Sequence, residues 1–182
     1  FSSLTFGPSV RAQTELVSRS SDFAADESKI YSPDNLTAQP LPFSQNWSNA
    51  GLITTNNDWS SVPGIVGYRG DDLTMATATD PQIITADGSG TPLNVTANQT
   101  DTTMATGGIF EFAITNPVVA LQGSGTADAP HIVFNLNTTG STGIVVSYNL
   151  RDIDGTSDNA VQPVALQYRV GGSGGYTNIP SA

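Results

Sequence analysis

The chain has 182 residues, enough for one domain with a real core, and carries a formal net charge of −10 with a pI of about 4.1. Lys29 is the only lysine and the arginines are scattered, so the chain lacks the clustered positive charge that nucleic acids and anionic membranes require of a partner. No apolar run approaches the roughly 20 residues that span a bilayer, which argues against membrane insertion.

Only 12% of the residues are charged, while Thr, Ser, Asn and Gly are abundant. This composition favours a β-rich protein of the extracellular space or the cell surface over a cytosolic helical one. The absence of cysteine favours a bacterial or archaeal source, because secreted eukaryotic domains of this size often carry disulfides. The first residues, FSSLTFGPSV, do not have the pattern of a signal peptide, so we expect a mature form.

Residues 1–40 differ from the rest and are predicted to form an N-terminal arm or linker. Ser21 can cap a short helix over residues 22–30, and Pro33 would stop it. The prolines of residues 33–42 predict an extended linker after it. The alternative interpretation is an ordinary first strand and loop of the domain that follows.

From Phe43 onward the sequence alternates strands with turns. Apolar residues recur with period two, the pattern of half-buried strands, in residues 108–115, 131–137, 143–150 and 164–170. Weaker strands are expected near residues 62–68, 82–86, 92–97 and 117–121. The opposite faces are expected to meet solvent through Asn135, Ser147, Asn149, Gln167 and Arg169.

Eight or more short strands at this spacing predict an all-β domain over residues 41–182. The expected architecture is an antiparallel β-sandwich of the jelly-roll or Greek-key type. No strand alternates with a long amphipathic helix, which argues against Rossmann-like and TIM-barrel folds, and no fixed repeat indicates a solenoid.

The end of the sequence reads as a hairpin, in which the GGSGG turn at 171–175 joins residues 164–170 to YTNI. A sandwich normally closes with a further strand. The arm at 1–40 would supply it, a neighbouring chain would, or the chain is truncated. An unpaired edge invites strand addition, so self-association through an open sheet edge or through the 1–40 arm is expected.

A loop rich in Asp follows the strand at 143–150 and offers oxygen ligands of the kind that Ca²⁺ prefers. The candidate ligands are Asp152, Asp154, Asp158 and Asn159, with Gly155 allowing a tight turn. The loop lacks the bidentate Glu of an EF-hand. The alternative is a turn whose Asp and Asn side chains bond their own backbone.

Two tryptophans lie in an Asn-rich stretch at residues 46–60. An exposed aromatic ring beside amides and carboxylates can bind a sugar, which makes Trp47, Trp59, Asn57 and Asp58 candidate glycan contacts. The alternative, which the pattern favours, is that both rings fill the core.

Enzymatic sites find little support. Ser173 in GGSGG matches a nucleophile elbow formally, but no helix follows, and the only histidine, His131, precedes it. A single His without Cys excludes zinc sites of the His and Cys type. Glu111 alone does not make the carboxylate pair of a glycosidase, and no phosphate-binding loop occurs.

Three stretches, LPFSQNWSNAGLITTNNDWSSVPGIVGYRGD (41–71), ALQGSGTADAPHIVFNLNTTG (120–140) and VSYNLRDIDGTSDNAVQPVALQYRVG (146–171), resemble a domain of large secreted bacterial proteins, often cyanobacterial. The resemblance covers residues 41–180. It implies a jelly-roll-like module found beside lamin-tail-like and nuclease-type domains, with no catalytic residues of its own. That family's pattern continues past residue 182 with further strands.

The sequence therefore predicts a non-enzymatic extracellular module with a structural or adhesive role, stabilised by Ca²⁺ if the Asp-rich loop binds it. One alternative is a self-assembling subunit of a filament or surface layer, joined by strand exchange. Another is a carbohydrate-binding module.

Overall fold

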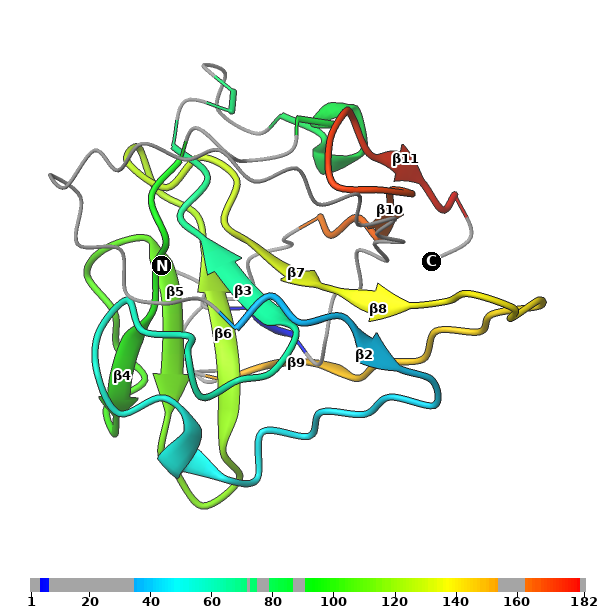
Figure 1. Cartoon of the computed structure of the whole chain (residues 1–182). Helices are drawn as coiled ribbons and strands as arrows, with labels where there is room; N and C mark the ends of the chain where they lie inside the picture. Colours follow the sequence, from blue (N-terminus) through cyan, green and yellow to red (C-terminus); the bar gives the residue numbers. More distant parts are fainter. Residues whose placement is uncertain are drawn as a thin grey trace, which may run out of the picture.

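The computed structural model describes residues 4–6, 35–71, 73–74, 79–86, 91–153 and 163–180, with the backbone alone for residues 4–6. The regular structure of these residues is strand, apart from two single-turn 3-10 helices, η1 (Ala50–Leu52) and η2 (Pro81–Ile83). The predicted all-β class is therefore confirmed (Figure 1). The helix predicted for 22–30 lies outside the described residues. Within them, no helix has the length and apolarity needed to cross a membrane.

The largest sheet has five strands in the order β4-β5-β6-β1-β9. These strands are β4 (Thr96–Gln99), β5 (Gly108–Phe112), β6 (Val118–Gln122), β1 (Leu4–Phe6) and β9 (Leu150–Asp152). The β4–β5 pair is parallel, and the other three pairs are antiparallel. Figure 1 shows β4, β5 and β6 side by side.

Three two-stranded sheets complete the described structure. Two are antiparallel, β3 (Ile65–Tyr68) with β7 (His131–Phe134) and β10 (Gln167–Tyr168) with β11 (Thr177–Asn178). One is parallel, β2 (Gln39–Pro40) with β8 (Leu136–Asn137). The hairpin predicted around the GGSGG turn is the β10–β11 pair.

The main core lies between the five-stranded sheet and the β3–β7 pair. Ile109 and Leu121 from the large sheet join Ile65 and Phe134 in one buried cluster. A second cluster, on the other face of β5 and β6, is formed by Phe110, Phe112, Val118 and Ala120. β5 confirms a strand within 108–115, but β5 and β6 are buried on both faces, so the predicted half-burial is wrong. Apolar residues lie on both faces of the strand, whereas the alternating pattern in the sequence indicates one apolar face only.

Several predicted elements differ in detail. Residues 82–86 do not form a strand, because Asp80 caps the η2 turn with its side chain and Pro81 suits the first helical position. The prolines of 33–42 do not prevent β2, since Pro40 lies in a short pair that loses no ladder bond to its missing N–H. Of the strand predicted at 143–150, only β9 forms, at its end.

The side chains expected to meet solvent divide into two groups. Ser147 and Asn149 are exposed, as predicted, whereas Asn135, Gln167 and Arg169 are buried. Each buried group has a partner inside the fold, as buried polar groups require. Gln167 Nε2 donates to the Ile84 carbonyl (3.1 Å), and Arg169 Nη1 donates to the Gly174 carbonyl (2.9 Å).

The segment predicted as an arm contributes strands to these sheets. β1 lies between β6 and β9, with Leu4 opposite Leu121 on one side and Asp152 on the other. β2 pairs with β8. Residues on both sides of position 40 therefore share sheets.

Candidate functional site: the groove beside residues 142–149

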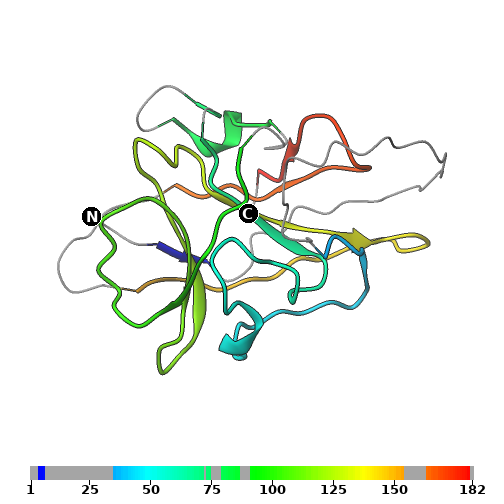
Figure 2. The ribbon, with the colours of Figure 1, turned by 60° about the vertical axis from the view of Figure 1, so that its left-hand side comes forward.

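A groove with a volume of about 780 Å³ lies between the segment after β2 and the segment before β9. We call it the strand groove. One wall is residues 41–47, the other is residues 141–151, and Phe134 and Leu136 also line it. In Figures 1 and 2 the chain between β8 and β9 projects from the body as a long loop and returns toward β9. The volume falls in the range typical of ligand pockets.

No strand is assigned to the wall formed by residues 142–149, in which Gly143 has a left-handed φ of 63°. Nothing in the described structure hydrogen-bonds to the backbone of these residues. The nearest ordered turn is upstream, where the Ser141 N–H donates to the Thr138 carbonyl (3.0 Å). Downstream, Arg151 Nη2 donates to the Asn116 carbonyl (2.6 Å) and ties the start of β9 to the body. The sequence of a strand is thus present without a neighbouring strand.

Trp47 on the opposite wall has an unusual backbone and an unpaired donor. Its φ is 59°, a left-handed value that bulky residues rarely adopt. Its backbone N–H donates to Gln45 Oε1 (2.9 Å). The side chain is 5% exposed, and its Nε1 has no hydrogen-bond partner. A buried indole N–H normally finds an acceptor. The donor itself is buried, so it has neither a partner nor an exposed surface toward the groove.

The residues predicted to bind a glycan do not form an exposed platform. Trp59 is fully buried, and Trp47 packs edge-on against it at 6.5 Å between ring centroids. Sugar stacking requires an exposed ring face, which neither tryptophan offers. This placement corresponds to the alternative, in which both rings fill the core. Asp58 Oδ1 accepts the Ser60 N–H (2.9 Å), a local turn contact.

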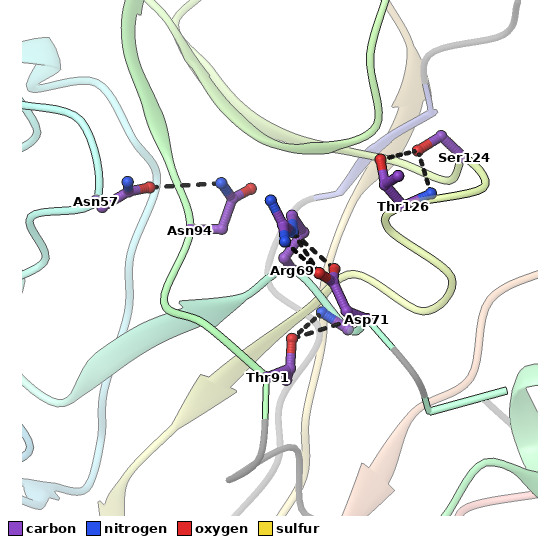
Figure 3. Close-up of polar contacts among 8 residues, drawn as sticks. Asn57, Arg69, Asp71, Thr91, Asn94, Ser124 and Thr126 are labelled. Atoms are coloured by element: carbon purple, nitrogen blue, oxygen red, sulfur yellow. Dashed lines mark hydrogen bonds and ion pairs between the residues drawn. The ribbon is translucent and has the colours of Figure 1, made fainter.

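Asn57 instead helps to seal the outer edge of β4. Its Oδ1 accepts the Val95 N–H (3.1 Å), and the neighbouring Asn56 Oδ1 accepts the Ala97 N–H (2.9 Å). Asn94 Nδ2 also donates to Asn57 Oδ1 (3.4 Å), as Figure 3 shows. Side-chain oxygens therefore take the place of a neighbouring strand at this edge.

A second polar cluster in Figure 3 is structural in the same way. Thr91 Oγ1 accepts the N–H groups of Gly70 (2.8 Å) and Asp71 (3.0 Å), and Arg69 forms an ion pair with Asp71. These contacts bind the end of β3 to the segment that leads into β4.

Glu111 is the buried carboxylate of the β4–β5 interface. It is 4% exposed, its Oε2 accepts the Asn98 N–H (2.6 Å), and its Oε1 has no partner. Burial raises the pKa of the Glu111 carboxyl, and the bond from Asn98 opposes this rise. The contact with Asn98 occurs where the register of β4 on β5 shifts, between Thr96 and Gln99.

The predicted calcium loop falls mostly outside the described residues, which include Asp152 but not Asp154, Asp158 or Asn159. Asp152 is exposed at the end of β9, opposite Leu4 of β1. Among the described residues, no three His, Cys, Asp or Glu side chains gather as metal ligands would. The calcium prediction stays untested.

The two remaining candidates have local partners or open surroundings. His131 stacks on Tyr68 at 5.4 Å between ring centroids, and its Nδ1 lies 2.8 Å from the Ala129 carbonyl. Ser173 is exposed in the turn between β10 and β11. Neither is placed beside the other by any contact within the described structure.

Comparisons with family models, curated proteins and solved structures found no match. The functional argument therefore depends on the placement of the residues themselves. Sequence reasoning missed the strand groove and the donor of Trp47. The signal for one wall was present, since residues 138–150 are uncharged and large apolar side chains recur at every second position from Ile144 to Leu150. No sequence signal shows that this strand lacks a partner.

Proposed function

We propose that this chain is a non-enzymatic structural module of an extracellular protein, folded as a jelly-roll-type sandwich, which assembles with copies of itself by exchanging β1. The observation that carries the proposal is the position of β1. All three of its residues pair with β9, and two of them, Leu4 and Thr5, also pair with β6. A long stretch of sequence separates β1 from β2. The single His and the absence of Cys support a role without chemistry.

Removing β1 would open two edges at once. Within the described residues, β9 pairs with β1 alone, and β6 would keep only β5. Exposed backbone edges accept a strand from another molecule. Because an extended chain advances about 3.3 Å per residue, residues 7–34 are long enough to carry β1 into a neighbouring copy. The same pairing would then close the sheet within one copy or join two.

The test compares the full chain with a variant lacking residues 1–6. Size exclusion with light scattering should show larger oligomers of the full chain, after refolding at high concentration, than of the variant. A labelled peptide of residues 1–8 should bind the variant one to one, and a scrambled peptide should not. The proposal would be contradicted if the full chain stays strictly monomeric after such refolding and the variant does not bind the peptide.

Calcium remains part of the proposal as a stabiliser of the loop after β9. A ligand that binds only the native state raises its stability. Thermal melts with calcium and with chelator should therefore differ, and Asp154→Asn together with Asp158→Asn should remove the difference. Identical melts of the unmodified chain would remove calcium from the proposal.

A further inference from the structure

A second pairing surface, separate from β1, is built into the strand groove. We propose that the groove is the docking site for residues 142–149 of a second copy, which pair antiparallel with the same residues of the first. The inference does not depend on the exchange of β1, because the groove and its walls are formed by residues 41–47 and 116–151.

The backbone of residues 142–149 makes main-chain pairing the expected mode of binding. A segment with free N–H and C=O groups gains a hydrogen-bond ladder when it becomes extended beside an added strand. Three large apolar side chains in the segment before and within β9 are exposed: Ile144, Val145 and Leu150. Val145 is 88% exposed, so it contributes nothing to the isolated fold. An added strand would cover these side chains and would also form hydrogen bonds with the free backbone groups.

The charge pattern identifies a second copy as the occupant. The chain has a net charge of −10, yet residues 138–150 contain no charged residue. Like charges directly opposite each other destabilise paired strands, and this segment can lie against itself without any. It also lacks proline and is rich in β-branched and aromatic residues, as strands that pair between copies are. An antiparallel pair of identical segments has the twofold symmetry that closes a dimer.

Trp47 supplies a specific contact for the incoming strand. Its Nε1–H is buried, unpartnered and on a residue that lines the groove. Its left-handed backbone is held in place by Gln45. Non-glycine residues kept in this conformation are concentrated at binding and active sites. In the isolated chain this donor has neither an acceptor nor an exposed surface, so a main-chain carbonyl of the second copy would reach it only if the Trp47 side chain shifts as the strand docks.

Cysteine scanning tests the register directly, because the chain contains no cysteine. Single substitutions Ile144→Cys, Val145→Cys, Val146→Cys and Ser147→Cys are oxidised separately. In an antiparallel pair, only residues at the twofold centre face their own copies, and each step away adds about 6.6 Å. Disulfides require Cα atoms about 4.4–6.8 Å apart. One or two adjacent positions should therefore give a linked dimer. Val170→Cys, an exposed apolar position elsewhere, is the control and should not.

Equilibrium measurements complete the test. Val145→Lys places two cations across the pair and should weaken dimerisation at least tenfold by light scattering, while the control Val170→Lys should not change it. Trp47→Phe keeps a ring but removes the donor and should weaken the dimer about fivefold. Equal crosslinking at every position, Val170 included, or a dimer unaffected by Val145→Lys, would overturn the inference.

The variant lacking residues 1–6 separates the two proposals. It should still dimerise through the groove, because no groove residue belongs to β1. If its dimer is lost while that of Val145→Lys is kept, association runs through β1 alone. The groove inference is then wrong and the exchange of β1 stands. If both variants dimerise as the full chain does, both proposals are wrong.

Discussion

The two ends of the five-stranded sheet are finished differently. At the β4 edge, Asn56 and Asn57 accept the backbone N–H groups of Ala97 and Val95, so side chains replace a missing neighbour. At the β9 edge, the residues leading into the strand, 142–149, have no such partner among the described residues. The β4 and β9 edges belong to one sheet, and residues 142–149 lie just before β9, outside that sheet. An unpaired edge and an unpaired segment face the same risk of unwanted pairing.

The difference indicates that the open edge is not a general weakness of the fold. Asparagine is abundant in this sequence and could accept backbone N–H groups at both edges. Among the described residues it does so at the β4 edge and not along residues 142–149. Nor does the open segment carry the charges or prolines that usually protect an edge strand. The sealed edge is thus the expected state of a free protein surface, and the open edge has the properties of an interface. The predictions below test each side.

Unsealing β4 should have the largest effect. In the double variant Asn56→Ala with Asn57→Ala, two buried N–H groups lose their acceptors, those of Val95 and Ala97. Each buried unsatisfied group costs about 1–3 kcal/mol, so the free energy of unfolding should fall by about 2–6 kcal/mol. Urea denaturation measures the change, and light scattering should reveal new association through the freed edge.

The matched control is Asn56→Asp with Asn57→Asp, which keeps both acceptor oxygens. It should lose clearly less stability than the alanine pair and should not associate through β4. Equal losses in both double variants would show that the oxygens do not seal the edge.

This edge also shows how far the sequence could be read. The strand pattern at 92–97 predicts a strand close to β4. The Asn-rich stretch at 46–60 predicts a glycan site, not the asparagine side chains that seal the β4 edge. Asn57 and Val95 are distant in sequence, so their contact depends on how the chain folds back. Alternation of apolar and polar residues predicts a strand but does not identify the strands beside it. For this reason residues 143–150 are predicted from the sequence as a paired strand.

A smaller loss is expected from Gly108→Ala, at the start of β5. The φ of Gly108 is 139°, and an added Cβ would lie 2.5 Å from Asn94 Oδ1, the atom that accepts the Ile109 N–H (2.7 Å). Strain and the displaced acceptor together should lower the free energy of unfolding by about 1–3 kcal/mol.

Gly125→Ala is its control, since nothing lies within 4 Å of the added Cβ. Its stability by urea denaturation should stay within about 0.5 kcal/mol of the unmodified chain. If Gly108→Ala were equally harmless, Asn94 would not be fixed against β5.

The two tryptophans allow the same substitution on both sides of the comparison. Trp59 Nε1 donates to the Asn94 carbonyl (3.2 Å), whereas Trp47 Nε1 has no partner. Both residues are buried, so replacement by phenylalanine removes a similar volume from each. Trp59→Phe should therefore cost about 1 kcal/mol more than Trp47→Phe, the net value of one hydrogen bond. The difference is read from paired urea titrations of monomeric protein at low concentration. Equal costs would mean that the Trp47 donor is satisfied in the free protein.

The burial of these rings leaves neither tryptophan with the exposed face that the glycan prediction assumes, and glycan binding itself stays untested. Trp47 was singled out as aromatic and near amides, and it does line the groove. Its exposure could not be predicted, because the same sequence describes a ring on the surface and a ring in the core. What distinguishes it, a left-handed backbone and an unmet donor, arises only when the surrounding segments are in place.

The smallest effect concerns Glu111, whose carboxylate joins β5 to the sealed β4 through the Asn98 N–H. Burial raises the pKa of Glu111 above its ordinary value of 4.5. A raised pKa in the folded state means that the contribution of Glu111 to stability is full below the unfolded pKa and is lost as pH rises through the folded pKa. Glu111→Gln keeps an oxygen for Asn98 and cannot ionise. Its free energy of unfolding, measured in urea between about pH 4 and 7, should therefore gain on that of the unmodified chain as pH rises. Glu111→Ala, which also loses the acceptor, should be less stable than Glu111→Gln at every pH. A constant difference between Glu111→Gln and the unmodified chain across this range would show that the carboxyl is solvated despite its burial, and that the β4 side of the sheet is open to water as well.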